Sequence, residues 1–361
     1  MGWHDEDLWG RRWKIYGIFS VARREKKLAL SNNILNPIAA KPDNPSPRLA
    51  QPVRITKQAW PEGAIPVVSI CCVAYNHEKF IRDCLDGFLM QETTFPVEIL
   101  IHDDASTDGT KEIIEEYCKK HPKLFFPIFQ KENQFSKGVR GMMLRFNFPR
   151  CRGKYIALCE GDDYWTDPHK LQKQADFLER NLDYIACFHN AWIDNSIENT
   201  KYIYHHWKES RAVSPKEIIE IGGYVFPTAA LMFRSLAKIN LPENCIAGDL
   251  SLSLDLLLQG QFYFSNEFMC VYRRHEDGIY SGIIKDYKKM QNLELSVIAL
   301  MENRRHQFPS NYDEYFKTAI KAKYNNLFYK LHFPIFGVIK ATKYYSLMGL
   351  LRLLIYRIFH E

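Results

Sequence analysis

The stretch VVSICCV, residues 67–73, decides how the rest of the sequence can fold. It is apolar almost without interruption, which is typical of a strand buried on both faces, because a strand with one wet face alternates polar and apolar residues. Apolar residues then recur at helical spacing from Ile81 to Leu89, and a second strand is predicted at residues 97–101. Strand, helix and strand in this order predict a parallel unit.

The alternation of strands and helices continues toward residue 180. We expect helices over residues 110–121 and 138–147, and strands over 124–129 and 155–159. A further helix is expected to begin at Asp167-Pro168, since Asp is a favoured N-cap residue and Pro is favoured at the first helical position. The sequence therefore predicts the α/β class, with a Rossmann-like, doubly wound and mostly parallel sheet.

Three parts of the chain differ in pattern. Residues 1–66 are broken by repeated prolines and are interpreted as an N-terminal arm or linker. Residues 67–280 carry the alternating strands and helices, and are predicted to form the main domain. Residues 281–361 are predicted to be a helical extension that is basic and aromatic toward its end.

The composition excludes several classes of protein. With 46% hydrophobic and 14% aromatic residues, the chain is too apolar for a disordered protein. The net charge of +6 is spread along most of the chain, whereas a nucleic-acid binder is expected to concentrate its basic residues in one patch, so no nucleic-acid partner is predicted. The nine cysteines form no regular framework and no secretory signal is recognised, which favours buried thiols in a cytoplasmic protein.

Polar turns follow three of the predicted strands, at the edge of the sheet where ligands bind in such folds. They are residues 74–77, 102–109 and 160–165. In the second turn, a carboxylate of Asp103 or Asp104 could accept a hydrogen bond from a base N–H or a ribose hydroxyl. Tyr75 in the first turn could stack on the base, although a core tyrosine is an equally good interpretation from residue type alone.

The third turn carries Glu160, Asp162 and Asp163, three carboxylates within four residues. Such close like charges favour a cation between them. Oxygen ligands without cysteine or paired histidine suit Mg²⁺ or Mn²⁺, and both commonly bridge to substrate phosphates. The competing interpretation is an exposed acidic turn, which the apolar strand before it and Trp165 after it make less favourable.

Three runs together resemble the family 2 glycosyltransferases of the GT-A fold. They are VSICCVAYNHEKFIRDCL, VEILIHDDASTDGT and GKYIALCEGDDYWTDPHKLQKQ, in the order and spacing of that family. The resemblance covers about residues 67–280 and is greatest to bacterial enzymes that build capsule, O-antigen or exopolysaccharide units. It implies an inverting transfer of a hexose or N-acetylhexosamine from a nucleotide sugar to a hydroxyl of a glycan or lipid-linked glycan.

The resemblance also implies which residues hold the donor. Tyr75 and Asp104 match positions that hold the base, with Asp103 beside them, and Glu160 and Asp162 match the region that binds the ribose and the metal. The family usually has Asp where this chain has Glu160, so the division of metal and ribose contacts stays open. We expect a UDP-sugar, because a carboxylate can accept the uracil N–H.

The same resemblance implies the metal ligands and the base. Asp162 and Asp163, with His275, are the expected ligands of Mn²⁺ or Mg²⁺. Asp249, just before a helix expected over residues 252–259, matches the region of the catalytic base, although it would also serve as a helix N-cap. Asp255 is the alternative base.

Two further interpretations belong to other classes. A nucleotidyltransferase would be expected to carry a Gly-rich basic loop after the first strand, where this chain has Tyr75-Asn76-His77-Glu78. A catalytically inactive relative that serves as an assembly partner is the other alternative.

The C-terminal part suggests a membrane surface. From Lys317 onward, eight basic residues stand against one acidic residue, among many aromatics and leucines. Because charges interrupt every apolar run, this pattern indicates helices in the interface of an anionic membrane rather than a spanning helix, and predicts a peripheral protein. The family resemblance implies that it lies on the cytoplasmic face, where a lipid-linked acceptor would be carried. A helical pair packed on the main domain, or a dimer interface, is the competing interpretation.

Overall fold

The computed structural model describes residues 46–240, 242, 245–330 and 344. The chain divides into two compact units. The larger unit comprises Asn33–Ile218 and Gly223–His275, and the smaller includes Ile219–Gly222 and Glu276–Glu361.

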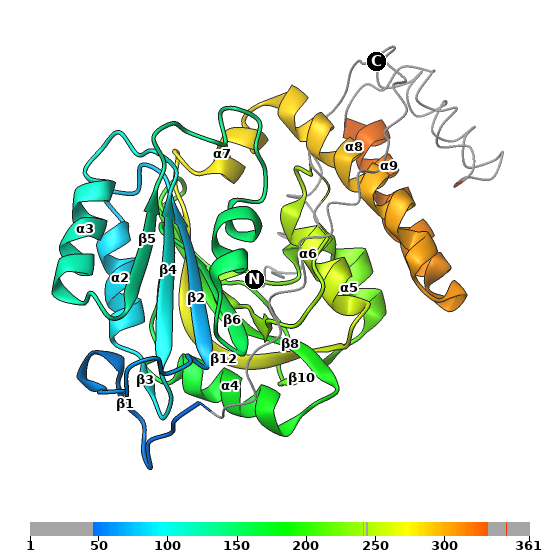
Figure 1. Cartoon of the computed structure of the whole chain (residues 1–361). Coiled ribbons are helices and arrows are strands. Elements are labelled where there is room, and N and C mark those ends of the chain that lie inside the picture. The colour runs from blue at the N-terminus through cyan, green and yellow to red at the C-terminus, as the bar shows by residue number, and fades with distance from the viewer. Residues whose placement is uncertain (1–45, 241, 243–244, 331–343, 345–361) are drawn as a thin grey trace, which may run out of the picture. The chain divides into compact units, whose positions relative to one another are not determined.

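The parallel strands of the larger unit form where the sequence predicts them (Figure 1). They are β2 (Val68–Ala74), β4 (Val97–Asp103), β5 (Phe125–Phe129) and β6 (Tyr155–Glu160). β2 lies between β4 and β6, and its register pairs Ile70 with Ile99 and with Ala157. These three side chains are fully buried, as expected for a strand covered on both faces.

The sheet continues beyond β6 as a mixed sheet. Its order is β10-β12-β8-β11-β6-β2-β4-β5. The added strands are β8 (Tyr184–Asn195), β10 (Arg211–Val213), β11 (Met232–Arg234) and β12 (Gln261–Arg274). β11 runs antiparallel to β6 and β8, while β8 and β12 run parallel to each other, so the predicted mostly parallel α/β sheet is confirmed. Two short strands lie off this path: β7 (Tyr164–Trp165) pairs with β12, and β9 (Thr200–Ile203) pairs with β8.

Helices flank the sheet, with α2 and α3 side by side next to β4 and β5 in Figure 1. The helices of the larger unit are α2 (Ile81–Leu89), α3 (Thr110–Lys120), α4 (Lys170–Arg180) and α6 (Gly248–Leu257). α5 (Pro215–Ile221) spans residues of both units. A small two-stranded sheet joins β1 (Val53–Arg54) to β3 (Glu92–Thr93).

Three helix predictions need correction. The helix expected over residues 138–147 is reduced to a π-helical turn at Met143–Asn147, because Gly138 and Gly141 adopt positive φ angles that a helix does not allow. α4 begins at Lys170 rather than at Asp167, whose side chain instead accepts a hydrogen bond from the backbone N–H of His169. α6 begins at Gly248, four residues earlier than expected.

The cysteines are free thiols, as the sequence predicts. Seven of the nine are buried, and they are distributed over β2, α2, the turn before β6, and strands β6, β8 and β12. They are Cys71, Cys72, Cys84, Cys151, Cys159, Cys187 and Cys270.

The smaller unit is helical. It contains α7 (Ile279–Ile284), α8 (Tyr287–Arg304) and α9 (Asp313–Lys330), and α8 begins at the N-cap Asp286, whose carboxylate accepts the N–H groups of Lys288 and Lys289. α8 and α9 pack together and bury Phe316, Ile320 and Leu327. The helices that the structure describes include none long and apolar enough to cross a bilayer. Most of the basic-aromatic segment lies in 331–361, where residue 344 alone is described.

Candidate active site

The turns after β2 and β4 are hydrogen-bonded to each other. The amide oxygen of Asn76 accepts the backbone N–H of Thr107 at 2.8 Å, and the Asn76 N–H reaches the Ser106 hydroxyl at 2.9 Å. That hydroxyl in turn donates to Asp103 Oδ1 at 2.5 Å. Asp103 is buried, and burial raises the pKa of its carboxyl while the hydrogen bonds from Ser106 partly oppose this. Asp103 therefore shapes the turn that holds the neighbouring carboxylate.

Asp104 anchors the loop that follows β5. Its carboxylate accepts the backbone N–H groups of Gln134 at 2.8 Å and Phe135 at 3.0 Å, and its carbonyl accepts the Asn133 side chain. Each carboxylate oxygen has two acceptor positions, so the side chain keeps the capacity to accept a further N–H. Tyr75, on the adjacent strand end, is 41% exposed, which makes the core interpretation of this tyrosine wrong.

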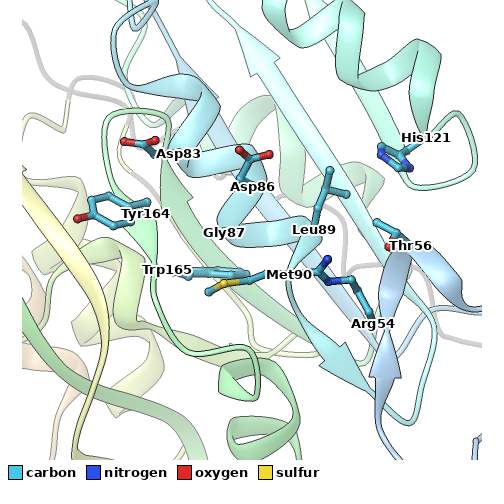
Figure 2. A pocket seen from close by; sticks show the side chains of 10 residues that line it. All are labelled: Arg54, Thr56, Asp83, Asp86, Gly87, Leu89, Met90, His121, Tyr164 and Trp165. Atoms are coloured by element: carbon cyan, nitrogen blue, oxygen red, sulfur yellow. The ribbon is translucent and has the colours of Figure 1, made fainter.

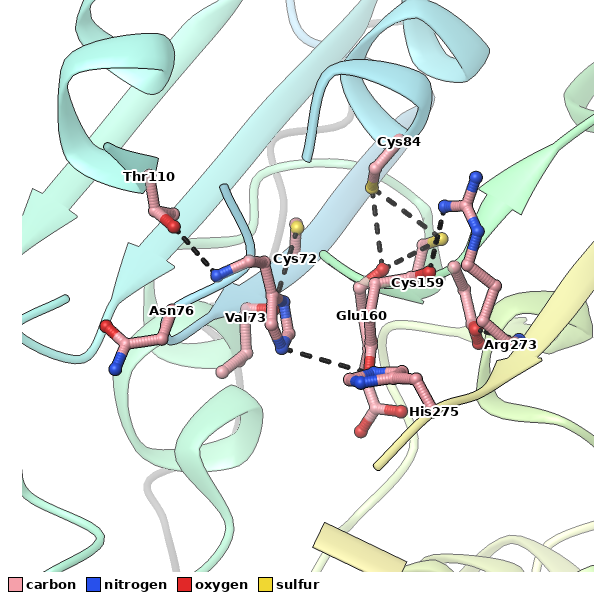
Figure 3. Close-up of polar contacts among 12 residues, drawn as sticks. Cys72, Val73, Asn76, Cys84, Thr110, Cys159, Glu160, Arg273 and His275 are labelled. Carbon is pink, nitrogen blue, oxygen red and sulfur yellow. Dashed lines mark hydrogen bonds and ion pairs between the residues drawn. The ribbon is translucent and has the colours of Figure 1, made fainter. Parts of the chain in front are cut away.

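The acidic turn after β6 is closely packed against the turn after β2. The Gly161 N–H donates to the carbonyl of Val73 at 2.9 Å. A Cβ atom at Gly161 would lie 2.9 Å from Nδ1 of His77, so glycine is required for this approach. The thiols of Cys84 and Cys159 each lie 3.5 Å from the carbonyl oxygen of Glu160 (Figure 3). The main chain of the turn is thus held by the carbonyl of Val73 and by these two thiols.

Burial raises the pKa of the Glu160 carboxyl to about 8, with added repulsion from Asp162 and Asp249. The repulsion from Asp249 acts between two elements, since Glu160 ends β6 and Asp249 belongs to α6. The exposed acidic turn is therefore the wrong interpretation for this motif, since Asp163 is also only 1% exposed.

Asp162 faces two histidines. Its Oδ2 lies 3.1 Å from Nε2 of His275 and 3.8 Å from Nε2 of His77. Burial opposes the ionisation of Asp162, but the hydrogen bond from His275 is the largest of the effects that favour the ionised form, and the pKa of Asp162 is lowered. Burial also lowers the pKa of His77, which favours a neutral ring that can donate a lone pair. The sequence pattern alone does not single out His77, although it follows the same strand end as Tyr75.

Asp163 has a different environment from Asp162. Its Oδ1 accepts the backbone N–H of Arg273 at 2.8 Å, while Oδ2 is buried without a hydrogen-bond partner in the described part of the chain. Burial raises the pKa of Asp163 well above its usual value, and repulsion from Asp162 and Glu160 adds to this. The structure thus brings Asp162 and His275 together and attaches Asp163 to the main chain of β12.

These residues fit a divalent cation that also binds a substrate. The donor atoms of Asp162 and His275, 3.1 Å apart, have about the spacing of two adjacent ligands in an octahedral shell with bonds of ~2.1 Å. The described residues contain no cluster of three or more histidine, cysteine or acidic side chains in a metal-holding arrangement. A cation here would therefore complete its shell with water and substrate phosphates, as Mg²⁺ commonly does.

Asp249 lies in the first turn of α6. The N-cap position belongs to Ala247 and makes no side-chain hydrogen bond, so the N-cap interpretation of Asp249 is wrong. Asp249 is exposed, and desolvation of its carboxyl by the surrounding protein raises the pKa to about 6. Asp255, the alternative base, is buried and accepts the backbone N–H of Asn240 at 2.6 Å.

A cavity of about 770 Å³ lies elsewhere in the larger unit (Figure 2). It is lined by residues of β1, α2 and β7 and by neighbouring positions, and none of the predicted site residues lines it. The lining residues are Arg54, Thr56, Asp83, Asp86, Gly87, Leu89, Met90, His121, Tyr164 and Trp165. The candidate active site is accordingly the carboxylate edge of the sheet and not this cavity.

Known proteins resemble this chain in sequence and in fold. Residues 69–239 match the family model described as Glycosyl transferase family 2. An uncharacterized protein of Mycobacterium tuberculosis is 35% identical over 62% of this chain, and the match spans 63% of the relative's length. The putative teichuronic acid biosynthesis glycosyltransferase TuaG of Bacillus subtilis is 29% identical over 62% of this chain and 85% of its own.

Among solved structures, S. aureus TarS residues 1–349 in complex with UDP superposes with a TM-score of 0.52. The alignment covers 78% of this chain and 76% of the TarS chain at 16% identity, which shows a shared fold.

Proposed function

The chain carries a family 2 glycosyltransferase domain, and on that premise we propose that it transfers a sugar, with inversion, from a nucleoside-diphosphate donor to an acceptor hydroxyl. The observation that carries the proposal is the 3.1 Å contact of Asp162 with His275. It lies at the same end of the sheet as Asp104, because β4 and β6 both run parallel to β2. Catalysis resides in residues 67–280.

The donor's nucleoside binds between the first two turns. Tyr75 supplies an exposed ring for stacking, and Asp104 supplies an acceptor for the base N–H. Asp103 holds the turn that presents Asp104, and Glu160 would bind the ribose hydroxyls. A uracil N–H matches a carboxylate acceptor, which favours a UDP-sugar.

The donor's diphosphate binds next to Asp162 and His275. These two side chains would hold Mn²⁺ or Mg²⁺, with Asp163 in support. When bound, the cation stabilises the charge that develops on the departing nucleoside diphosphate. Asp162 is well suited to this position, because its pKa is lowered and it stays ionised at neutral pH.

Asp249 removes the proton from the acceptor hydroxyl. With a pKa of about 6, its carboxyl is mostly ionised at neutral pH and is a stronger base than an ordinary aspartate. The acceptor oxygen then attacks the anomeric carbon as the bond to the diphosphate breaks. One displacement of this kind inverts the anomeric configuration, and the proton ends on Asp249.

The acceptor is a glycan or lipid-linked glycan in the assembly of a bacterial surface polysaccharide. The printed name of TuaG, a putative glycosyltransferase of teichuronic acid biosynthesis, supports this class of product. The basic-aromatic C-terminal segment would hold the protein at the cytoplasmic face of an anionic membrane, close to such a lipid. The transferred sugar is a hexose or N-acetylhexosamine.

A thermal-shift screen of nucleotide sugars, with and without Mn²⁺, tests the proposal. Ligands that bind the folded state raise the midpoint of unfolding, so a UDP-sugar with Mn²⁺ should give the largest shift. Release of UDP in the presence of a glycan acceptor then distinguishes a transferase from an inactive assembly partner. Absence of a shift with every nucleotide sugar would exclude the proposed function.

A further inference from the structure

We propose that Arg273 is a positioning residue that fixes the turn bearing Asp162, and that Asp83 on α2 anchors it. This rests on the proposed function, in which Asp162 binds the divalent cation. The contacts of Arg273 described below carry this assignment.

Arg273 holds two successive residues of the acidic turn. Its backbone N–H donates to Asp163 Oδ1 at 2.8 Å, and its Nη1 donates to the carbonyl oxygen of Asp162 at 3.0 Å. Its Nη2 forms an ion pair with the carboxylate of Asp83. One side chain thus links the end of β12 and the acidic turn to helix α2, three elements that are far apart in sequence.

Aromatic rings confine the guanidinium. Its central carbon lies 4.3 Å from the centroid of the Tyr164 ring and 5.3 Å from that of Phe80. The Arg273 side chain is 14% exposed, whereas that of Asp83 is 57% exposed. Figure 2 shows Asp83 and Tyr164 next to each other at one side of the cavity. The anchor can therefore be changed at the surface without disturbing the core.

The contact to the Asp162 carbonyl matters because the side chain of the same residue meets His275. A fixed carbonyl limits the rotation of the Asp162 backbone and keeps Oδ2 at its 3.1 Å distance from His275. A guanidinium can reach the carbonyl and Asp83 together because its donors lie in a rigid fork, which a lysine cannot reproduce. Outer contacts that orient metal ligands typically contribute 10–100-fold to metal affinity or activity.

The experiment compares Asp83→Asn, Arg273→Lys and Arg273→Gln with the full-length wild-type protein. Arg82→Gln is the matched control, because it breaks an exposed ion pair with Glu116 from the neighbouring position of α2 and leaves the acidic turn untouched. Binding of Mn²⁺ in the presence of UDP is measured from the electron paramagnetic resonance signal of free Mn²⁺. Binding of UDP alone and the unfolding midpoint are measured in parallel.

We expect Asp83→Asn and Arg273→Lys to raise the half-saturating Mn²⁺ concentration by about 10-fold, and Arg273→Gln by about 10–100-fold. UDP binding without metal should stay as in wild type, and Arg82→Gln should match wild type throughout. Adding Asp83→Asn to Arg273→Gln should cause no further loss, because the two residues act as a unit.

Unchanged Mn²⁺ binding in Asp83→Asn and Arg273→Lys would overturn the proposal. Weaker UDP binding without metal in these variants would instead assign Arg273 to the diphosphate. A wild-type protein that binds neither UDP nor any nucleotide sugar would exclude the proposed function itself, and this outcome is recognised before any variant is compared.

Discussion

Nε2 of His275 lies 3.1 Å from Oδ2 of Asp162, although the two residues are 113 positions apart. His275 follows the end of β12, and Asp162 belongs to the turn after β6. β12 reaches this place because it pairs along its length with β8 and also binds β7, which comes directly after the acidic turn. The pairing of β12 with β7 is thus what completes the candidate metal site.

Asp162 and Asp163 should differ in their effect on metal binding. Asp162→Asn removes a charge next to His275, so Mn²⁺ binding and metal-dependent transfer should be lost. Asp163→Asn keeps an oxygen that can accept the Arg273 N–H, so we expect a smaller loss. Titration of both variants with Mn²⁺ measures the difference.

Chelation provides the control for this prediction. Wild-type activity should vanish in EDTA and return with Mn²⁺ or Mg²⁺. Full activity in chelator would contradict the metal dependence, and equal losses in the two variants would support Asp163 as a direct ligand.

Asp249→Asn should reduce the transfer rate by ~10²–10⁴-fold, the usual cost of losing a general base. The amide keeps the shape of the side chain, so donor binding measured by thermal shift should remain. Asp255→Asn is the comparison, and because Asp255 accepts the Asn240 N–H, its main effect should be a lower unfolding midpoint. Near-normal turnover in Asp249→Asn would remove this residue from the mechanism.

The same base predicts a pH dependence. The pKa of Asp249 is raised to about 6 by desolvation, and the ionised form is the active one. The rate should therefore fall as the pH drops through about 6, and it should be flat just above. A profile of kcat/KM against pH measures this decrease on the acidic side. The decrease should be absent from the residual activity of Asp249→Asn.

Asp104→Ala should weaken UDP binding whichever sugar is attached. The variant loses the acceptors for the N–H groups of Gln134 and Phe135, so the loop after β5 should also become more sensitive to proteolysis. Glu132→Gln, which removes an exposed ion pair with Lys137 in the same loop, is the control and should bind UDP as wild type does. Tighter binding of GDP than of UDP would reject the uridine assignment.

The C-terminal segment should bind anionic membranes. Full-length protein should sediment with vesicles that contain phosphatidylserine at low salt, and high salt should weaken binding because each basic residue contributes through its charge. The matched variant is a protein truncated after Lys330, at the end of α9. A shorter protein could lose the buried side chains of Phe316, Ile320 and Leu327. Sedimentation of the truncated protein with the vesicles would show that the segment has another role.

Local pattern predicts much of this fold. Continuous apolar runs located β2 and β4 to within a residue or two, because burial on both faces leaves no place for polar side chains. The acidic turns after β4 and β6 can be recognised in the sequence as candidate site residues, because carboxylates directly after a buried strand have no role in the core. The start of α6 was missed because Gly248 and Ala247 carry no capping side chain.

Long-range contacts could not be obtained in this way. Nothing near Asp104 in sequence indicates that its carboxylate binds the loop at Gln134 and Phe135, 30 and 31 residues away. Nothing in the sequence distinguishes His77 and Arg273 from other polar residues. The structure indicates their role because both contact Asp162, His77 from the turn after β2 and Arg273 from β12. Such partners depend on strand order, which local periodicity does not specify.

The buried thiols can be used to measure the local opening of individual strands of the sheet. A thiol that is shielded in the folded protein reacts with an alkylating reagent only while its strand is transiently exposed, so each modification rate measures a local opening free energy. Cys71 and Cys72 report on β2, while Cys187 and Cys270 report on β8 and β12. Pulse alkylation followed by peptide mass analysis would therefore reveal the order in which the strands separate, without introducing any probe into the chain.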